Sequence, residues 1–368
     1  MLCLWSSVAR ADSKPEALRV VSWNVWGVPF VSDSREARMR RIGPAIANLR
    51  PNVVLLQELW DEADARLVVS DLAAAGLRYQ VHDASVRFAA FGCSGLLIAA
   101  DRPLHDVARL DYELGRWPHT PYHLDWLSRK AALAATIDTP SGKLLLVNTH
   151  WQAAYRTGNY APVRVAQSLE LADWLSTRPA PHLLLAGDFN VEPGERATDW
   201  LSERLRLREV VGGDGLDRIF TSGVHLGAAR QELTEVLTLD DGERISLSDH
   251  PAWVAELSLQ GNREETRVAS VEPALVGELA AEARTLKRQV WVARVFALLG
   301  ALLLLRVSFS GWIRGGGFGW FARRRRAVRR ALALATALGT AYAAYFALGY
   351  GPAQARGLEH ALERLRGS

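Results

Sequence analysis

The chain has 368 residues, of which 49% are hydrophobic, a net charge of +4 and only two cysteines. Its length suits two or three average domains, or one large domain with additional segments, and two cysteines exclude a disulfide framework. The basic excess lies near the C-terminus, around residues 323–330. The overall positive charge therefore does not indicate a nucleic-acid-binding surface on the rest of the chain.

The first eleven residues resemble the end of a secretory signal peptide. Residues 1–8 are short and apolar, and Ala9-Arg10-Ala11 has the A-x-A pattern of a cleavage site. The basic start and most of the apolar region of such a signal are missing. The alternative interpretation is that these residues carry no targeting signal. Residues 1–11 are therefore a candidate remnant of a signal peptide.

Residues 12–260 read as one domain of alternating strands and helices. β-Branched and leucine runs predict strands at 18–21, 53–56, 144–147 and 183–186, and apolar spacing predicts helices at 35–49, 63–75 and 163–176. Further strands are expected at 79–82, 88–91, 95–99, 218–220 and 252–257, and a hairpin joins 131–137 to 143–148. Strand runs with few crossover helices favour an α/β fold of two mixed sheets packed face to face with helices outside.

Two apolar segments follow a charged linker at residues 261–287. Residues 288–307 and 328–350 each approach the length that crosses a bilayer, about 20 residues. A basic loop with Gly and Trp, 308–327, separates them, and a tail follows at 351–368. The first segment is the weaker candidate because Arg294 lies inside it. A soluble helical hairpin docked on the domain is the alternative interpretation.

The distribution of arginines predicts how this hairpin is oriented. The short basic loop is expected on the cytoplasmic side by the positive-inside rule. Both termini, and with them the domain at 12–260, are then expected on the extracytoplasmic side, which agrees with a remnant export signal. Lys287, Arg288 and Arg294 on the outer flank weaken the rule.

Short polar motifs stand at the ends of predicted strands. They read Ser22-Trp23-Asn24, Gln57-Glu58, Asn148-Thr149-His150, Gly187-Asp188-Phe189-Asn190 and Ser248-Asp249-His250. A buried strand that ends in such a side chain brings it to the rim of a sheet, where catalytic sites are built. Oxygen ligands, including one or two carboxylates, are what Mg²⁺ binds in proteins. Glu58, Asn24 and Asp249 are therefore the expected metal ligands.

Two histidines among these motifs suit proton transfer and phosphate binding. His250 has the pKa range of a general base, and Asp217 is the candidate acid that orients it. Asp188 and Asn190 are two residues apart, so on an extended segment they point the same way and position a water and a phosphate oxygen. His150 is expected to donate to phosphate. Singly each residue has an ordinary structural explanation, but the set indicates phosphate-ester hydrolysis.

Together and in this order, the motifs from Asn24 to His250 resemble the endonuclease/exonuclease/phosphatase superfamily. The resemblance implies a four-layered α/β-sandwich, in which two packed mixed β-sheets are flanked by helices. It also implies a divalent-metal hydrolase with His250 as the base and Asp217 as its partner. Members cut DNA, RNA, inositol phosphates or sphingomyelin, so membership alone does not identify the substrate.

Three segments look like the neutral sphingomyelinases: residues 23–43, 125–131 and 163–171. In those enzymes an Asp and a Lys five positions apart act as a switch near the active site, and Asp125 and Lys130 match them. A surface ion pair is the ordinary alternative for this pair. Two C-terminal spans likewise resemble one membrane-bound type of neutral sphingomyelinase. The stretch between Asn190 and Asp217 is short, so a loop on the substrate side is expected to be shorter than in the family.

The resemblance implies a Mg²⁺-dependent phosphodiesterase of the phospholipase C type, with Mn²⁺ or Co²⁺ as alternative cofactors. Its substrate would be sphingomyelin or a related phospholipid, cleaved to ceramide or diglyceride and a phosphocholine-type headgroup. A metal-dependent nuclease, a phosphoesterase for another lipid and a membrane-tethered binding protein are the alternatives. No basic patch stands out in residues 12–260, so nucleic acid is not the expected partner. The exact lipid and the oligomeric state do not follow from the sequence.

Overall fold

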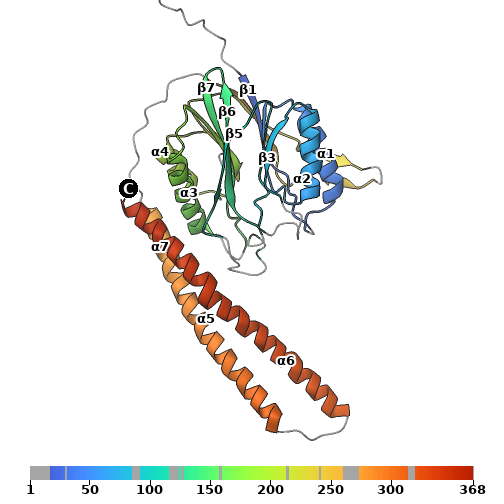
Figure 1. The fold of residues 1–368 in the computed structure, drawn as a ribbon, viewed down its shortest axis with the longest axis vertical. Helices are drawn as coiled ribbons and strands as arrows, with labels where there is room; N and C mark the ends of the chain where they lie inside the picture. The colour runs from blue at the N-terminus through green and yellow to red at the C-terminus, as the bar shows by residue number, and fades with distance from the viewer. Residues whose placement is uncertain are drawn as a thin grey trace, which may run out of the picture.

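A computed structural model describes residues 17–29, 31–84, 92–115, 123, 125, 128–156, 160–212, 215–239, 242–259, 273–313 and 320–367. The predicted signal remnant at 1–11 and the predicted strand at 88–91 lie outside these residues. Two six-stranded mixed sheets face each other, with helices on the outside (Figure 1). The predicted four-layered α/β-sandwich is confirmed.

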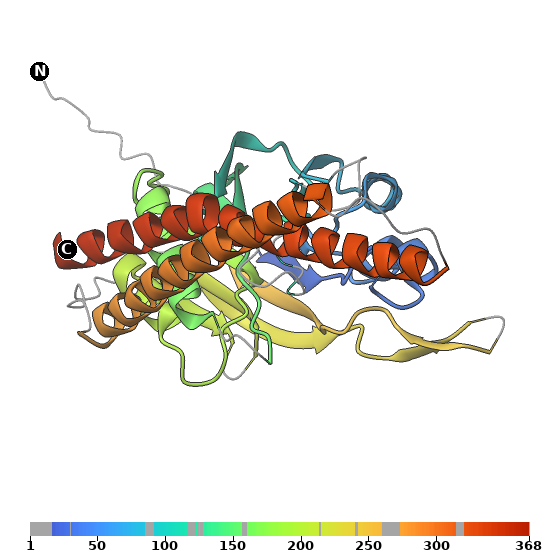
Figure 2. The same ribbon diagram turned by 90° about the horizontal axis from the view of Figure 1, so that it is seen from below.

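The two sheets are built from separate parts of the chain. The first contains β1 (Ala17–Asn24), β2 (Val53–Gln57), β3 (Tyr79–His82), β4 (Leu97–Ala100), β11 (His225–Glu232) and β14 (Ala252–Ser258), in the order β11-β14-β1-β2-β4-β3. The second contains β5 (His105–Asp111), β6 (Ala131–Thr139), β7 (Gly142–His150), β8 (His182–Asp188), β9 (Arg208–Val211) and β10 (Asp217–Ser222), in the order β5-β6-β7-β8-β10-β9. A small hairpin of β12 (Val236–Thr238) and β13 (Arg244–Ser246) projects from the body (Figure 2).

Each sheet contains one parallel pair, and these two pairs determine where the polar motifs lie. β1 runs parallel to β2, and Asn24 is opposite Gln57. β7 runs parallel to β8, and His150 is opposite Asp188. Parallel neighbours end at the same edge of a sheet, so each pair brings its motifs to one rim. The remaining neighbours in the two sheets are antiparallel.

The core explains why the strand sequences are apolar on both faces. Val20, Leu55 and Ile98 face the second sheet and share a fully buried cluster with Leu146 and Leu184. The alternate residues of the same strands pack under the outer helices. A strand covered on both sides reads as a continuous apolar run rather than an alternating one.

Two helices cover each sheet. α1 (Arg35–Asn48) and α2 (Glu62–Ala74) lie on the first sheet, and α3 (Ala161–Ser176) and α4 (Ala197–Leu205) lie on the second (Figure 1). The predicted apolar face of α1 is buried at Met39, Ile42 and Ile46. At the start of α2, the Asp61 carboxylate accepts hydrogen bonds from the first backbone amides, which caps the helix.

The C-terminal part of the chain forms a long helical hairpin. α5 (Pro273–Ile313) and α6 (Trp320–Tyr345) are its arms, and a π-helical turn η2 (Phe346–Tyr350) joins α6 to α7 (Gly351–Gly367). Much of the predicted linker at 261–287 is thus already the first part of α5, because its apolar positions pack on the domain. Residues 351–367 of the predicted tail form the helix α7 for the same reason.

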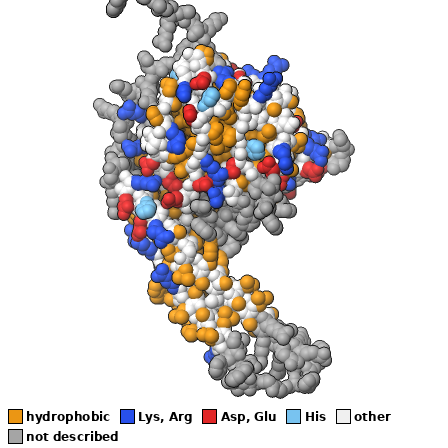
Figure 3. Space-filling view, viewed as in Figure 1, with side chains coloured by type: hydrophobic (Ala, Val, Ile, Leu, Met, Phe, Trp, Pro, Cys, Tyr) orange, Lys and Arg blue, Asp and Glu red, His pale blue; other side chains and the backbone are white. Residues whose placement is uncertain are grey.

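Two segments, Leu275–Arg306 and Ala331–Arg364, are long and apolar enough to cross a membrane. Over residues 291–305 and 331–345 their side chains are half-buried or exposed, and Phe296 and Leu338 are each 63% exposed. The space-filling view shows this part of the hairpin as a nearly continuous apolar surface (Figure 3). A buried core helix would not present such a surface, so these segments are candidate membrane spans.

The hairpin is attached to the second sheet through a shared core. Leu279 and Leu286 of α5 and Leu358 of α7 are buried in the same cluster as Val165 and Leu169 of α3. α5 and α7 therefore dock on the outer surface of α3, while the far part of the hairpin leaves the domain (Figure 1). The docked parts of α5 and α7 therefore belong to the same packed body as the second sheet.

Candidate active site

The polar motifs converge where the strands of both sheets end. Asn24 ends β1, and Glu58 follows β2 directly. His150 and Asp188 end the parallel strands β7 and β8. Two further motif residues come from antiparallel neighbours of these strands, since Asp217 begins β10 and His250 precedes β14; they are described below.

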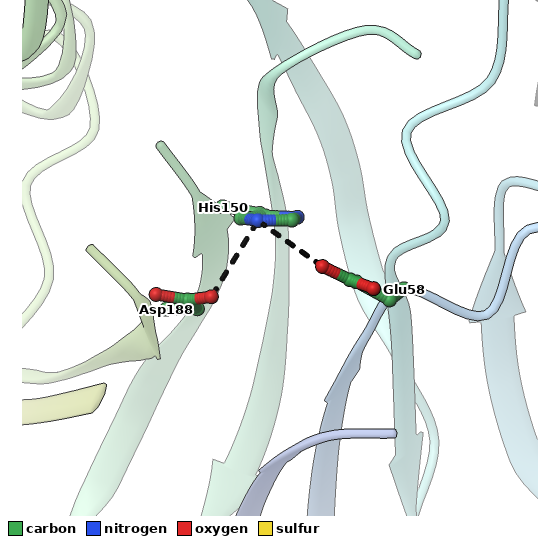
Figure 4. Close-up of side chains that lie close together, drawn as sticks. All are labelled: Glu58, His150 and Asp188. Carbon is green, nitrogen blue, oxygen red and sulfur yellow. Dashed lines mark ion pairs between the residues drawn. The ribbon is translucent and has the colours of Figure 1, made fainter. Parts of the chain in front are cut away.

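Glu58, His150 and Asp188 form a compact group of metal-ligating side chains (Figure 4). The Nε2 atom of His150 lies 3.8 Å from Glu58 Oε1 and 3.5 Å from Asp188 Oδ2. Potential ligand atoms of the three residues all lie within 4.8 Å of one another. His150 and Asp188 are buried, at 2% and 1% exposed. Two carboxylates so close together in a buried site favour a bound cation.

The Glu58 carboxylate is suited to bind a cation. Its Oε2 atom is buried and has no hydrogen-bond partner among the described residues. Burial raises the pKa of Glu58 to about 7, although Lys130 and the amide of Asn24 lower it. A divalent cation beside Oε2 would satisfy the buried oxygen and stabilise the carboxylate form. The residues present therefore fit a divalent metal.

Asn24 joins the two carboxylates through its amide nitrogen. Nδ2 donates to Glu58 Oε1 at 3.1 Å and to Asp188 Oδ2 at 2.9 Å. Its Oδ1 atom accepts a hydrogen bond from the backbone N–H of Trp26 at 3.0 Å. Asn24 thus lies in the predicted metal region but presents hydrogens to the carboxylates. Its direct ligation of a metal through oxygen stays a prediction.

Asp249, the third predicted ligand, is placed differently. Its side chain is exposed and accepts a long hydrogen bond of 3.4 Å from Ser248 Oγ. It belongs to neither of the two metal-ligating groups found among the described residues. Because the chain turns at this point, His250 faces the site while the neighbouring carboxylate faces solvent. A metal role for Asp249 stays a prediction.

His250 and Asp217 form the predicted pair. The Nδ1 atom of His250 lies 2.9 Å from Asp217 Oδ2, and its Nε2 atom lies 4.0 Å from Asp188 Oδ2. Burial alone would lower the pKa of His250, but the hydrogen bond with Asp217 and the charges of Asp188, Asp217 and Asp249 raise it to about 10. Burial raises the pKa of Asp217 to about 6. The arrangement orients the imidazole with Nε2 toward the shared carboxylate Asp188.

The backbone around His250 is held by the first sheet. Trp23 Nε1 donates to the carbonyl of His250 at 2.9 Å, and Ser248 Oγ donates to the carbonyl of Asn24 at 2.6 Å. The N–H of His250 in turn donates to Ser248 Oγ at 3.1 Å. Trp23 and Ser248 therefore hold the backbone of His250 in place. Both residues belong to the polar motifs, but the sequence analysis assigned them no role.

Lys130 and Asp125 also meet at the site. The Lys130 ammonium lies 3.1 Å from Asp125 Oδ1 and donates to His150 Nε2 at 2.8 Å. Lys130 is buried, at 3% exposed. Burial and the charge of Lys130 lower the pKa of His150 well below its usual value, so this imidazole is neutral and accepts at Nε2. The Asp/Lys pair is part of the site rather than a surface ion pair.

Asn190 lies beside the same carboxylate. Its φ is 52°, a left-handed conformation, and its backbone N–H donates to Asp188 Oδ1 at 3.0 Å. The side-chain Nδ2 donates to the carbonyl of Trp151 at 3.1 Å. Asn190 orients Asp188 through its backbone, and its predicted contact with a phosphate oxygen stays a prediction.

Two buried polar residues were not predicted. Gln152, at 4% exposed, donates from Nε2 to Asp125 Oδ2 at 2.9 Å. Arg164, fully buried on α3, donates from Nη1 to the carbonyl of Gln152 at 2.9 Å and from Nε to Glu195 at 2.8 Å. An arginine between two valines of a predicted helix was the available signal for Arg164. For Gln152 the only signal was its position two residues after His150.

Comparison with known proteins agrees with this site. The sequence profile of the Endonuclease/Exonuclease/phosphatase family matches residues 21–250. Sphingomyelin phosphodiesterase 2 of Homo sapiens is 30% identical over 197 residues, which cover 52% of this chain and 45% of that protein. Inositol phosphosphingolipids phospholipase C of Schizosaccharomyces pombe is 32% identical over 187 residues, which cover 50% and 43%. The chain spans about half the length of the curated relatives it matches.

Solved structures show the same fold. Beta toxin from Staphylococcus aureus superposes with a TM-score of 0.52 at 18% identity, over 65% of this chain and 99% of that chain. Sphingomyelinase C from Streptomyces griseocarneus superposes with a TM-score of 0.52 at 19% identity, over 66% and 99%. The profile match covers more than half of the chain and contains every strand end described above. The chain belongs to the endonuclease/exonuclease/phosphatase family.

Proposed function

We propose that this protein is a metal-dependent phosphodiesterase of the phospholipase C type. Its substrate would be sphingomyelin or a related phospholipid, and its products ceramide or diglyceride and a phosphocholine-type headgroup. The observation that carries the proposal is that the Glu58–His150–Asp188 group and the His250–Asp217 pair share Asp188. Phosphodiester hydrolysis needs a cation site and an oriented base at one reacting phosphorus.

The lipid class is supported by the relatives. Those from human and fission yeast are named for sphingomyelin and for inositol phosphosphingolipids, respectively. Both names describe phosphodiesters of a sphingoid lipid. The two candidate membrane spans of this chain favour a substrate that resides in a bilayer. A nucleic-acid substrate has no comparable support here.

Glu58 and Asp188 would hold the metal, and we propose Mg²⁺, with Mn²⁺ or Co²⁺ as alternatives. Mg²⁺ prefers oxygen ligands and often binds through one or two carboxylates. When bound, it supplies positive charge that polarises a phosphoryl oxygen. A beta toxin structure from Staphylococcus aureus contains bound magnesium ions, which supports this choice.

His250 would act as the general base. Its Nδ1–H donates to Asp217, so Nε2 is the atom that takes a proton from the attacking water. The carboxylates that raise the pKa of His250 include Asp188, whose charge a bound cation would offset. The imidazole would then be neutral at a lower pH than in the metal-free protein. Asp217 keeps the ring in the required tautomer and stabilises the imidazolium that forms.

Lys130 and Asn190 would bind the phosphoryl oxygens, and His150 would orient the Lys130 ammonium, since its Nε2 accepts from Lys130. The Lys130 ammonium has three protons; one faces Asp125 and one faces His150. The third is a donor for the negative charge that develops in the transition state. His150 and Asn190 both lie beside Asp188: His150 Nε2 is 3.5 Å from Asp188 Oδ2, and the N–H of Asn190 donates to Asp188 Oδ1 at 3.0 Å.

We also propose that α5 and α6 span a membrane and that the catalytic domain lies on the extracytoplasmic side. The exposed apolar surface of the arms supports the span, and the arginines around residues 323–330 support a cytoplasmic position for the loop between them. In Figure 1 the strands that carry the site end on the side of the domain toward which the hairpin extends. Such an arrangement would direct the rim toward lipid.

The experiment is a headgroup-release assay with the full chain. Mixed micelles of sphingomyelin, phosphatidylcholine, lysophosphatidylcholine or an inositol phosphosphingolipid are incubated with Mg²⁺ or with a chelator, and plasmid DNA is tested in parallel. We expect release from a sphingolipid that stops with chelator and returns with added Mg²⁺. Cleavage of the plasmid with no lipid hydrolysis would show that the protein is a nuclease and overturn the proposed lipid hydrolysis.

A further inference from the structure

Gln354 of α7 is hydrogen-bonded to the segment that follows β5, across 239 residues of sequence. Its Oε1 accepts from the N–H of Gly115 at 3.3 Å, and its Nε2 donates to the carbonyl of Glu113 at 3.5 Å. Gln354 is 3% exposed. One turn later, a Cβ atom on Gly357 would lie 2.9 Å from Leu114 Cδ2. α7 therefore holds residues 113–115 by both hydrogen bonds and close packing.

The other side of this segment contacts two buried glutamines. Gln167 Nε2 donates to the carbonyl of Leu114 at 3.0 Å, and Gln167 Oε1 accepts from the N–H of Gln152 at 3.0 Å. A Cβ atom on Gly115 would lie 2.6 Å from Gln152 Oε1. The segment thus has no free space between α7 and the glutamines, and a shift of α7 must move it or leave buried polar groups unpaired.

The path continues into the active site. Gln152 Nε2 donates to Asp125 Oδ2 at 2.9 Å. Asp125 Oδ1 lies 3.1 Å from Lys130 Nζ, which donates to His150 Nε2 at 2.8 Å. The side chains of Gln354, Leu114, Gln167, Gln152, Lys130 and His150 are each less than 5% exposed. In such a low-dielectric interior, a hydrogen bond that is lost is not replaced by water.

We propose that Gln354 is a positioning residue for the active site. Docking of α7 would hold residues 113–115 against Gln167 and Gln152, and these would keep Asp125 paired with Lys130 beside His150. Because α7 continues from η2 and α6, the helical hairpin would be coupled to the geometry of the site. The activity readout below rests on the proposed phosphodiesterase function, but the exchange readout does not.

The test compares Gln354→Leu with Arg356→Ala in the full-length chain, in detergent micelles. Arg356 is exposed on the same helix, so its variant controls for any change on α7. We expect Gln354→Leu to lower kcat about 10-fold, within the range of coupling through a network, with KM changed less than twofold. Arg356→Ala should leave both constants unchanged. Gln167→Leu should also lower kcat, and the double variant should lose little more than Gln167→Leu alone.

Hydrogen exchange provides the readout that does not need activity. In Gln354→Leu, amides in residues 108–115 and 147–156 should exchange at least 10-fold faster, while those of α1 and α2 keep their wild-type rates. Unchanged exchange in both segments, acceleration throughout the chain, or additive losses in the double variant would contradict the proposal. A wild-type chain without phosphodiesterase activity would overturn the proposed function instead, and the exchange result would still decide the coupling.

Discussion

Asp188 and Asp217 are directly opposite each other on β8 and β10, and they face the two nitrogens of His250. Asp217 Oδ2 lies 2.9 Å from Nδ1, and Asp188 Oδ2 lies 4.0 Å from Nε2. One carboxylate therefore orients the proposed base, and the other connects it to the proposed cation site. The antiparallel register of β8 and β10 brings the two carboxylates to the same imidazole.

Replacing Asp217 with Asn should reduce kcat by roughly 10² to 10⁴, because the amide cannot stabilise the imidazolium and favours the wrong tautomer. KM for the lipid should change little. The pKa of His250 should fall without this carboxylate, so the acidic limb of the pH–rate profile of the residual activity should move to lower pH. Steady-state headgroup release at saturating Mg²⁺ measures both effects. Activity within threefold of wild type would contradict this role for Asp217.

Glu58→Gln should abolish both headgroup release and stabilisation by metal. A cation at 100 times its dissociation constant stabilises the folded state by about 2.7 kcal/mol, so the wild-type Tm should rise with Mg²⁺. The variant should show no such rise and should unfold at or above the Tm of the metal-free wild type, since a buried carboxylate has been made neutral. Glu256→Gln, at a half-exposed ion pair with Arg19, is the control and should keep the Mg²⁺ response.

Removing only one member of the Asp125–Lys130 ion pair should destabilise the protein more than removing both. Asp125→Ala leaves the Lys130 ammonium buried without its carboxylate, which costs about 3 kcal/mol or more. Asp125→Ala combined with Lys130→Met removes both charges and should regain part of that loss. Urea unfolding of the two variants measures the difference. A double variant less stable than Asp125→Ala would contradict this prediction, because it would show that the buried Lys130 charge is not destabilising without its carboxylate.

Glu170 on α3 should make the protein less stable as the pH rises. Burial raises its pKa to about 7 from the ordinary 4.5, so between these values the folded state binds more protons than the unfolded state. The slope of unfolding free energy against pH is then negative for this group. Glu170→Gln keeps an acceptor for the N–H of Glu113 and should stabilise by about 1–2 kcal/mol at pH 8. Near pH 4.5 the two proteins should be equally stable by urea unfolding.

The proposed topology predicts which positions an impermeant maleimide reaches in intact cells. In a background of Cys3→Ala and Cys93→Ala, Arg78→Cys, exposed on the catalytic domain, should be labelled without permeabilisation. Gly316→Cys, in the predicted cytoplasmic loop, should be labelled only after permeabilisation. Labelling in the reverse pattern would place the catalytic domain in the cytoplasm and leave the span intact.

Most of the central strands could be predicted because they are buried on both faces. β2 and β8 are apolar runs that end in a polar motif, and such a run is recognised as a buried strand from the sequence alone. β11 (His225–Glu232) and β9 (Arg208–Val211) were not predicted, because half of the residues in these edge strands are polar and most of them are exposed or half-buried. α4, with nine residues, was also missed, since it is too short to show a helical period clearly.

The candidate site was predictable in its residue types and less so in its contacts. The strand ends placed Glu58, His150, Asp188 and His250 on one rim, because parallel neighbours end together. The orientation of the Asn24 amide and the outward turn of Asp249 depend on local backbone hydrogen bonds that no motif encodes. Gln354 lies 239 positions from its partner Gly115, and only the packed structure reveals a contact across that separation.

The common core of α3, α5 and α7 would also affect the kinetics of lipid hydrolysis. An enzyme body fastened in this way to a bilayer anchor would not leave the membrane between turnovers. Its encounters with lipid would follow lateral diffusion in two dimensions, so turnover would scale with the mole fraction of substrate in the leaflet and be insensitive to the bulk amount of vesicles.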